Sequence, residues 1–480
     1  MSEFVFQEIL DALGARRVQG NPRACTRGLS TDSRTIEPGQ LFVALSGPNF
    51  DGNQFVLDAV ERGAAGVILR EDPQLGELDT GDVPIAAVTD TRVALGDLAA
   101  WHRSRMKIPV IGITGSCGKT TTKNMLRELL STSMQVHVSP ASFNNDIGVP
   151  LTILSTPTTA DVVVVEIGTN APGEIASLCS IARPTCGVIT NVGAAHLEGL
   201  GSVEGVAREK GCLAAAIPPD GFVVLNADCR WTELIETMAT SGNLQFGIDR
   251  PSERVGDLDA RNVHFHAGCT TFELAGRALG GESREVTLPL LGLHTVQNLL
   301  AALTTCLGLG LDLDRVLAAV SRLRDGRRRM ERIEAGGITV LDDTYNANPE
   351  SARASVRVLA GLHGFDRRVL VLGDMYELGE YAAEKHREVG AFAAHAGLDL
   401  VILVGEHVRD SADGARKAGL STNQVIHFAD PDAAIDGVPS LLSDGDVVLV
   451  KGSRAVGMER IVMRIVELNL SMQEAELELA

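Results

Sequence analysis

Seven short, almost purely apolar runs place the strongest limit on how this chain can fold. Each run ends in glycine or a polar residue, and helical stretches lie between the runs. Continuous Val/Ile runs that alternate with helices are typical of strands buried on both faces of a parallel sheet. Ligands of such sheets bind beyond the carboxyl ends of the strands, so we expect the chemistry in the polar residues that follow each run. The runs are residues 110–115, 161–168, 186–193, 222–228, 368–374, 400–406 and 446–452.

The chain has 480 residues, which suggests about three domains of roughly 150 residues each. The first hundred residues mix strands and helices, with a strand signal at 41–47 and a helix signal at 94–106. A basic stretch, 322–332, interrupts the later alternation of runs and helices. We therefore expect an α/β protein of three domains: an N-terminal mixed α/β domain (1–106), a central parallel-sheet domain of the phosphate-loop ATPase type (107–326) and a C-terminal Rossmann-like α/β domain (327–480).

The composition excludes several functional classes. Apolar residues make up 45% of the chain, enough for several cores, but aromatic residues make up only 4%, which disfavours a stacking surface for single-stranded nucleic acid. The formal charge of −19 repels nucleic acid and anionic membranes. No apolar run reaches the ~18 residues of a membrane span, and the N-terminus lacks a secretion signal. Eight scattered cysteines without a C-x-x-C pair predict free thiols in a cytoplasmic protein, which we expect to be a monomer.

The segment Gly112–Met125, GITGSCGKTTTKNM, is the first candidate site. It ends like a phosphate-binding loop in Gly-Lys-Thr, but Ile113 occupies the position of the first glycine in the usual pattern. A strand, a glycine turn and a helix start point backbone N–H groups and a helix dipole at an anion. Lys119 would then neutralise phosphate charge and Thr120 would offer a hydroxyl to Mg²⁺. The alternative is an ordinary strand-to-helix turn with an exposed lysine.

Other polar residues follow the apolar runs or lie near helix starts. Glu166 ends a run, where Mg²⁺ would be a natural partner for a buried carboxylate, and His196 follows the next run as a candidate second metal ligand or a packed loop residue. Lys210 stands between charged neighbours and, by itself, predicts solvated helix surface. Asn298, near the start of a helix, suits either an adenine edge or a helix cap. Residues 341–351, LDDTYNANPES, fit either a site or simple turn chemistry.

Taken in order, these segments resemble the Mur ligase family, which forms amide bonds at the expense of ATP in peptidoglycan precursor synthesis. The resemblance runs from about Ser30 to Arg454. The front segment, 30–56, is similar to the UDP-sugar-binding domain of the family, and YNANP is typical of the member that adds the final dipeptide. The motifs are TGSCGKTTTK, SFNNDIGVPLTIL, EIGTNAPGEI, TNVGAAHLEGLGS, LDDTYNANPES, LGDMYELG and LVKGSR.

The resemblance implies roles for individual residues. The phosphate loop is read as Thr-Gly-x-x-Gly-Lys-Thr from Thr114, with Cys117 as a bystander. Catalytic roles fall to Lys119, His196 and Lys210, the last matching a lysine that is carbamylated in several members. The implied Mg²⁺ ligands are Thr120, Glu166, His196 and carbamylated Lys210. The implied ATP contacts are Thr114, Gly115, Gly118, Lys119, Thr120, Thr121, Asn298, Arg329 and Asp343. The implied substrate contacts are Ser33, Asn144, Asn145, Tyr345 and Asn346.

Three points in this transfer stay open. The arginine that reaches ATP is one of Arg327, Arg328 and Arg329, with Arg329 favoured because the following Met-Glu matches the family pattern. Cys212 stands where the family commonly has glutamate, and Thr295 stands where asparagine usually follows the histidine.

The resemblance also implies a reaction. We expect ATP and Mg²⁺ as cofactors, and D-alanyl-D-alanine joined to UDP-N-acetylmuramoyl-tripeptide through an acyl phosphate. The third residue of the tripeptide is diaminopimelate or lysine. One alternative is a related ligase that adds diaminopimelate or lysine, although no D-N-P-R motif is present. A more remote alternative is a phosphate-loop switch that binds nucleotide without making a product.

Overall fold

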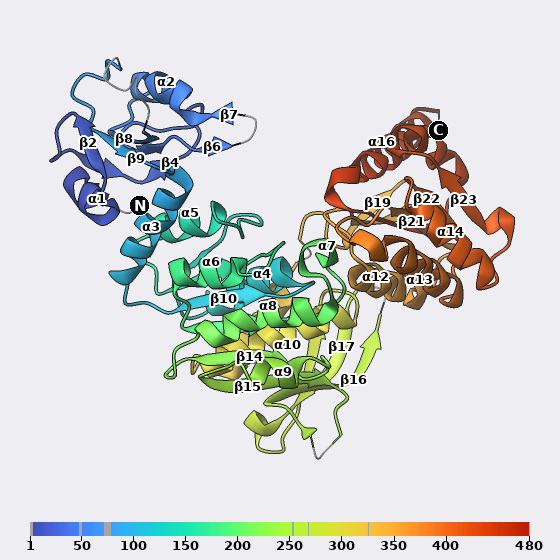
Figure 1. Ribbon diagram of the computed structural model, residues 1–480. Coiled ribbons are helices and arrows are strands. Elements are labelled where there is room, and N and C mark those ends of the chain that lie inside the picture. Colours follow the sequence, from blue (N-terminus) through green and yellow to red (C-terminus); the bar gives the residue numbers. More distant parts are fainter. Residues whose placement is uncertain are drawn as a thin grey trace.

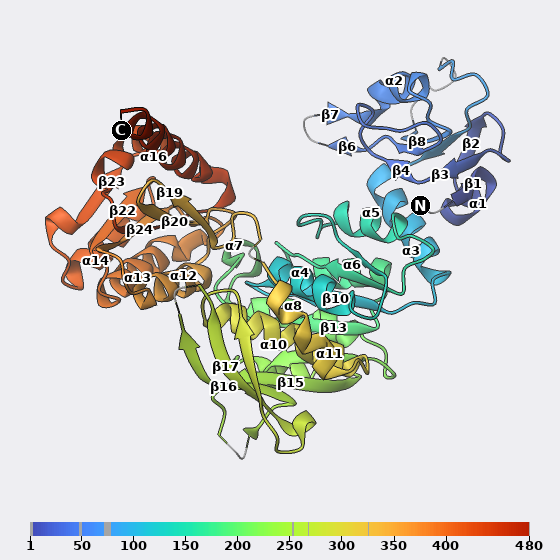
Figure 2. The ribbon, with the colours of Figure 1, turned by 180° about the vertical axis from the view of Figure 1, so that it is seen from behind.

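Three α/β units follow one another along the chain, each built on its own main sheet (Figure 1). The first and last units lie on opposite sides of the central one, and the view from behind shows the same arrangement (Figure 2). The expected three-domain α/β architecture is confirmed. The structure, a computed structural model, describes residues 3–47, 50–71, 78–251, 254–266, 268–324 and 326–479.

The first unit has a five-stranded sheet in the order β2-β9-β8-β5-β4, with two short antiparallel ladders, β1-β3 and β6-β7, outside it. The pairs β9-β8, β8-β5 and β5-β4 are parallel, and β2 pairs antiparallel with β9. The strands are β1 (Glu3–Val5), β2 (Arg16–Gln19), β3 (Cys25–Arg27), β4 (Leu29–Ser30), β5 (Leu41–Val43), β6 (Ser46–Gly47), β7 (Phe50–Asp51), β8 (Gly66–Arg70) and β9 (Ile85–Val88). The helices are α1 (Phe6–Leu13), α2 (Val56–Glu61) and α3 (Thr91–Ser104).

The central unit has a nine-stranded sheet in the order β11-β12-β10-β13-β14-β15-β16-β17-β18. The four apolar runs between residues 110 and 228 form β10, β12, β13 and β14, which are parallel as predicted. The strands are β10 (Val110–Thr114), β11 (Val136–Val138), β12 (Val162–Glu166), β13 (Cys186–Ile189), β14 (Phe222–Asn226), β15 (Gly242–Ile248), β16 (Leu258–Phe265), β17 (Thr270–Ala275) and β18 (Arg284–Leu288). The helices are α4 (Lys119–Leu130), α5 (Gly148–Leu154), α6 (Glu174–Ala182), α7 (Leu197–Leu200), α8 (Val203–Ala216), α9 (Thr232–Glu236), α10 (Leu293–Gly308) and α11 (Leu313–Ala318).

The antiparallel end of this sheet, β16-β17-β18, is a feature that the apolar runs do not signal. In β17 buried residues largely alternate with half-buried ones, so this strand has one solvent-facing side. Such strands read as alternating patterns, whereas strands buried on both faces read as continuous apolar runs.

The third unit has a six-stranded sheet in the order β19-β20-β24-β21-β22-β23, parallel except for the β19-β20 pair. The three later apolar runs form β21, β22 and β24. The strands are β19 (Glu331–Ala335), β20 (Ile338–Asp343), β21 (Arg367–Gly373), β22 (Leu400–Val404), β23 (Val425–Phe428) and β24 (Asp446–Lys451). The helices are α12 (Pro349–Gly361), α13 (Ala382–His395), α14 (Val408–Lys417), α15 (Pro431–Gly437) and α16 (Glu459–Leu479).

Helix α3 joins the first unit to the central one. Its buried residues Leu95, Leu98 and Ala99 belong to one hydrophobic core with Val110 and Val163 of the central sheet. The last buried residue of the helix, Arg103, donates to the carbonyls of Ala182, Arg183 and Met106 at 2.9, 3.0 and 2.9 Å. The carbonyls of Ala182 and Arg183 lie at the C-terminal end of α6, where the helix dipole favours a cation. The division of the chain at residues 106 and 326 stays a prediction.

Replacing Arg103 by alanine is expected to lower the free energy of unfolding by about 3 kcal/mol, because buried carbonyls lose charged donors. Chemical denaturation followed by circular dichroism measures the change. The control is Arg208→Ala, which removes an exposed ion pair with Glu204 on α8 and should cost less than about 0.5 kcal/mol. Equal losses in the two variants would contradict the proposed role of Arg103 as the tie between α3 and α6.

All eight cysteines are free thiols. In the part of the chain that the structure describes, no helix combines the length and the hydropathy that crossing a membrane requires.

Candidate active site

The segment between β10 and α4 folds as a tight loop, as its sequence predicts. Gly115 has φ 153°, and a Cβ at this position would clash with Thr190 Oγ1. Gly118 has φ 84°, and a Cβ there would clash with the Asn298 side chain. Both positions therefore require glycine. Asn298 lies in the second turn of α10, so it is not a helix cap, and its amide packs against the loop.

Glu166 ends β12 directly beside the first turn of α4. Its side chain is only 2% exposed. Oε2 accepts a hydrogen bond from Thr120 Oγ1 at 2.9 Å, and Oε1 accepts one from Asn144 Nδ2 at 3.0 Å. The ammonium of Lys123 lies 3.8 Å from Oε2 and also donates to the Ser139 carbonyl at 2.8 Å. The buried carboxylate is thus held in one orientation, with a hydroxyl at hydrogen-bond distance.

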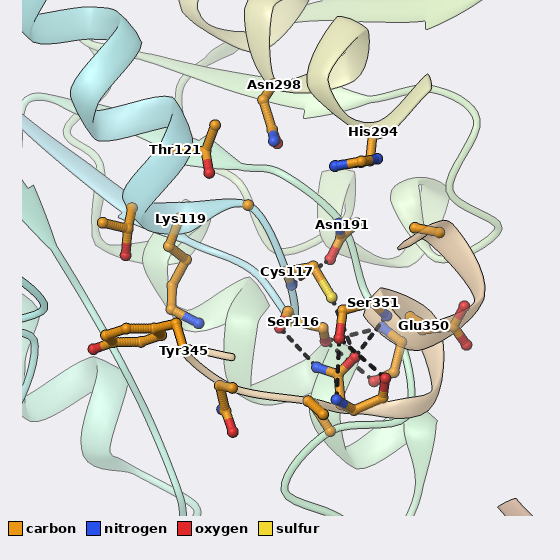
Figure 3. A pocket seen from close by; sticks show the side chains of 18 of the residues that line it. Ser116, Cys117, Lys119, Thr121, Asn191, His294, Asn298, Tyr345, Glu350 and Ser351 are labelled. Carbon is orange, nitrogen blue, oxygen red and sulfur yellow. Dashed lines mark hydrogen bonds between the residues drawn. The ribbon is translucent and has the colours of Figure 1, made fainter. Parts of the chain in front are cut away.

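Lys119 and Arg329 bring two cations to the start of α4 from different units. Lys119 Nζ donates to the Gly115 carbonyl at 2.7 Å, and burial lowers the pKa of Lys119 while Glu166 opposes that shift. Arg329 Nη2 donates to Thr120 Oγ1 at 2.9 Å, and its guanidinium lies 4.0 Å from the centre of the Tyr345 ring. Figure 3 shows Lys119 and Tyr345 at the same cavity.

The neighbouring arginines have other surroundings. Arg328 donates to Glu459 Oε1 at 3.0 Å, and Arg327 is exposed. Among the three candidate arginines, only Arg329 lines the cleft, which favours it as the arginine of this site.

Asp343 ends β20 in the third unit. Its Oδ2 accepts hydrogen bonds from Lys451 Nζ and Ser355 Oγ, both at 2.6 Å. Lys451, which is 2% exposed, also donates to the Asn346 carbonyl at 3.0 Å. The lysine therefore fixes both Asp343 and the turn that carries Tyr345 and Asn346. His294 lines the cleft nearby, and burial lowers its pKa to about 4, so it is neutral at pH 7.

His196 faces the third unit. It has a left-handed backbone, φ 55°, just before α7, and its Nδ1 lies 2.6 Å from Glu377 Oε2. This contact with His196 is the main cause that lowers the pKa of Glu377. The Glu198 backbone N–H donates to the Glu377 carbonyl at 3.3 Å. The loop around Glu377 is thereby seated on the loop that carries His196.

Lys210 is buried on α8, so the interpretation as solvated surface is wrong. Its side chain is 1% exposed. Burial, with a smaller contribution from the positive charge of Lys119, lowers the pKa of Lys210 to about 7. Cys212 donates to the Arg208 carbonyl and packs against a core cluster with Cys179.

A cleft of about 1600 Å³ collects most of the predicted residues. Four predicted residues are not on its lining: Thr114 ends β10, Gly115 belongs to the loop, Lys210 is buried on α8, and Ser33 lies in the first unit. Asn145 lines the cleft, and its Oδ1 accepts from the Gly148 N–H at the start of α5 at 2.9 Å. The predicted residues on the lining are Gly118, Lys119, Thr120, Thr121, Asn144, Asn145, Glu166, His196, Asn298, Arg329, Asp343, Tyr345 and Asn346.

Sequence reasoning missed several residues of this site. Lys123, Glu377 and Lys451 each contact a predicted residue from a distant part of the chain, and a charged side chain in a helix or loop gives no signal of its partner. Lys451 had the clearest signal, because it ends the apolar run 446–452 as Glu166 ends 161–168.

The residues present fit a magnesium ion shared with phosphates. Thr120 and Glu166 offer a hydroxyl and a carboxylate oxygen 2.9 Å apart, which are the hard oxygen ligands that Mg²⁺ prefers. Within the described ranges, no group of three or more His, Cys, Asp and Glu is arranged to hold a metal ion. The chain would therefore supply only part of the ligand set, as is usual when phosphates complete it.

The fold and the cleft define a phosphate-loop α/β protein in which a third unit contacts the loop. Three family models match: "Mur ligase family, catalytic domain" at residues 26–103, "Mur ligase middle domain" at 113–306 and "Mur ligase, glutamate ligase domain" at 328–454. The chain belongs to the Mur ligase family.

Similar proteins agree with this assignment. The UDP-N-acetylmuramoyl-tripeptide--D-alanyl-D-alanine ligase of Escherichia coli K12 is 38% identical over 92% of this chain and 93% of its own. The Bacillus subtilis protein of the same name is 34% identical over 92% of this chain and 94% of its own. A crystal structure of MurF from Acinetobacter baumannii has a TM-score of 0.88 at 31% identity, covering 97% of this chain and 99% of its own. MurF from Thermotoga maritima in complex with ADP has a TM-score of 0.78 at 28% identity, covering 92% and 97%.

Proposed function

We propose that this chain joins D-alanyl-D-alanine to UDP-N-acetylmuramoyl-tripeptide at the expense of ATP, in peptidoglycan precursor synthesis. The observation that carries the proposal is the phosphate loop, with Lys119, Thr120 and Glu166 at its helix start, in a cleft that the third unit completes. Proteins named for this reaction are similar to the chain over nearly its whole length.

The chemistry follows from the weakness of a carboxylate as an acylating agent. A tripeptide carboxylate oxygen attacks the γ-phosphorus of ATP, the bond to the ADP oxygen breaks, and an acyl phosphate forms. The dipeptide amine then attacks the carbonyl carbon, loses a proton, and expels phosphate from the tetrahedral intermediate. Protein groups catalyse such steps mainly by positioning and by stabilising charge.

Each part of the cleft has a role in this scheme. Lys119 and the backbone N–H groups of the loop hold the phosphates, and Arg329 adds a second cation from the third unit. Asn298 would contact adenine, and Asp343, which Lys451 holds in place, would reach the nucleotide. Thr120, Glu166 and His196 would hold Mg²⁺, which neutralises charge on the transferring phosphoryl group when bound.

The substrate has contacts in all three units. Asn144, Asn145, Tyr345 and Asn346 line the cleft where the tripeptide and the dipeptide would meet. The first unit, including Ser33, would hold the UDP end. Approach of the three units would exclude water and protect the acyl phosphate from hydrolysis. We further propose that the protein is cytoplasmic and acts as a monomer. Light scattering at working concentration would test the monomeric state.

The deciding experiment measures phosphate release with two substrate pairs. The expected result is release with UDP-N-acetylmuramoyl-tripeptide and D-alanyl-D-alanine, and none above background with the dipeptide precursor and free diaminopimelate or lysine. The opposite preference would identify a diamino-acid-adding ligase. Nucleotide binding without release with either pair would identify a switch.

Gly118→Ala is expected to weaken ADP binding at least about tenfold, because its Cβ would clash with Asn298 at a positive φ. The matched control is Gly310→Ala, since Gly310 also has a positive φ, 76°, but open space around its Cβ. Calorimetric titration with ADP measures both. Equal affinity in the two variants would place the nucleotide away from this loop.

A further inference from the structure

One peptide unit of the phosphate loop is held at both ends by asparagines from different units of the protein. The Cys117 N–H donates to Asn191 Oδ1 of the central unit at 2.9 Å. The carbonyl of the same peptide, Ser116 O, accepts from Asn348 Nδ2 of the third unit at 3.2 Å. Rotating this peptide about its flanking bonds would break both hydrogen bonds. Figure 3 shows the bonds around Ser116 and Cys117.

The amide of Asn348 is well matched to this task. It is the N-cap of α12, where Oδ1 accepts from the Ser351 N–H at 2.9 Å. The same Oδ1 accepts from Cys117 Sγ at 3.3 Å. Both lone pairs of the oxygen and one N–H of the amide are therefore used. Aspartate lacks the donor and serine lacks the reach, so asparagine alone combines a helix cap with both loop contacts.

The neighbouring loop groups are fixed by the central unit. Thr190 Oγ1 donates to the Cys117 carbonyl at 2.5 Å, and Ser116 Oγ donates to the Gly193 carbonyl at 3.1 Å while accepting from the Gly193 N–H at 2.9 Å. The Ser116 carbonyl depends on the third unit. Cys117 is thus not a bystander, because its N–H, its carbonyl and its thiol each have a partner.

We propose that Asn348 is a positioning residue that couples docking of the third unit to the conformation of the phosphate loop. When α12 is seated, Asn348 fixes the 116–117 peptide, and the following N–H groups point at the phosphates. When the third unit moves away, that peptide is restrained at its N–H end only. The inference rests on the proposed function, because it assigns Asn348 to the phosphoryl-transfer step of that reaction.

The coupling predicts a specific kinetic signature. Nucleotide binds the loop, Lys119 and the α4 N-terminus, so loss of Asn348 should leave the Kd for ADP within about threefold of wild type. Phosphoryl transfer requires fixed geometry, and a small misplacement can cost up to a hundredfold, so kcat should fall by about tenfold or more. A residue that merely contacts nucleotide would change Kd and kcat/KM together.

The test compares Asn348→Ser, which keeps a helix cap but is too short to bridge the loop, with Ser351→Ala. The second variant weakens the same helix end, where Ser351 Oγ accepts from the Asn348 N–H at 3.0 Å, without touching the loop. Only Asn348→Ser should lose kcat. Hydrogen exchange of the 115–118 amides in the ADP complex should speed up in that variant alone, and thermal melting of both variants reports on folding.

A double-mutant cycle with Cys117→Ala checks that Asn348 acts through the loop. Cys117→Ala removes only the thiol contact to Asn348 Oδ1, whereas Asn348→Ser removes that contact and the bond to the Ser116 carbonyl, so Cys117→Ala should cost little further kcat in the Asn348→Ser background and the two losses should not add. Any of three results would overturn the proposal. The first is wild-type kcat and wild-type amide exchange in Asn348→Ser. The second is a loss of kcat in Ser351→Ala equal to that in Asn348→Ser, and the third is strictly additive losses of kcat in the double mutant. A wild-type chain that releases no phosphate would instead refute the proposed function, while the exchange comparison would still test the coupling.

Discussion

Lys119→Ala is expected to lower kcat for phosphate release by about a thousandfold or more. The Lys119 side chain is half-buried at the start of α4, where desolvation lowers its pKa, so its charge is screened less than on an open surface and should stabilise the transferring phosphoryl group. In this structure it donates to the Gly115 carbonyl, a contact that a phosphate oxygen would replace. The measurement is steady-state phosphate release with tripeptide precursor and dipeptide, with ADP affinity determined separately.

Two companion variants sharpen this experiment. Lys119→Arg keeps the charge but places a planar, larger group in a closely packed loop, so it should recover only a small part of the rate. Lys417→Ala removes an exposed lysine at the end of α14 and should match wild type. A Lys119→Ala protein that ligates within about tenfold of wild type would contradict the assignment of the loop.

The sequence predicts the framework of the site because strand ends are local features. Glu166 and Asp343 each end a buried run, and the structure places both on one cleft, although they belong to different sheets. The glycines of the phosphate loop predict the loop and the start of α4. The structure shows why glycine is needed there, because a Cβ at either loop glycine would clash with Thr190 or Asn298. The arginine choice also rests on local pattern, and the structure favours Arg329 over its two neighbours.

Contacts between distant parts of the chain could not be predicted in the same way. Asn348 to Ser116, Glu377 to His196 and Lys451 to Asp343 join residues more than 100 positions apart, and no periodicity records which side chains meet. The burial of Lys210 was also hidden, because charged neighbours on a helix normally indicate solvent. Its surroundings come from the packing of α8 against α6 and α9 and the central sheet, which only the tertiary structure reveals.

We propose that the neutral amine of Lys210 forms a carbamate with CO₂, and Lys210→Ala is then expected to lower kcat by about a hundredfold or more through loss of that carbamate. In that step the Nζ lone pair attacks the carbon of CO₂, an Nζ proton is released, and a carboxylate-like anion results. An ordinary lysine is only about 0.04% neutral at pH 7, whereas a pKa of about 7 makes roughly half of Lys210 neutral. The structure thus supplies the reactive form that carbamylation needs.

The supply of CO₂, added acetate and the pH should each change kcat if the carbamate takes part in catalysis. Removing dissolved CO₂ should slow the wild type and leave Lys210→Ala unchanged, while millimolar acetate should rescue Lys210→Ala at least about tenfold by placing a carboxylate in the vacated space. Because burial lowers the pKa, the amine gains a proton as the pH falls through about 7, and the CO₂-dependent part of the rate should decline there.

The pH dependence of stability provides an independent control. The unfolded chain keeps Lys210 protonated up to about pH 10, and the folded chain without CO₂ releases that proton near pH 7, so stability should rise with pH between these values. Lys210→Met should remove this rise, because methionine fills the space without a titrating group. If CO₂ removal, acetate and pH all leave the ratio of kcat between the wild type and the Lys210 variants unchanged, the carbamate is not part of the mechanism. Lys210 would then act only through the positive charge of its ammonium, beside Lys119.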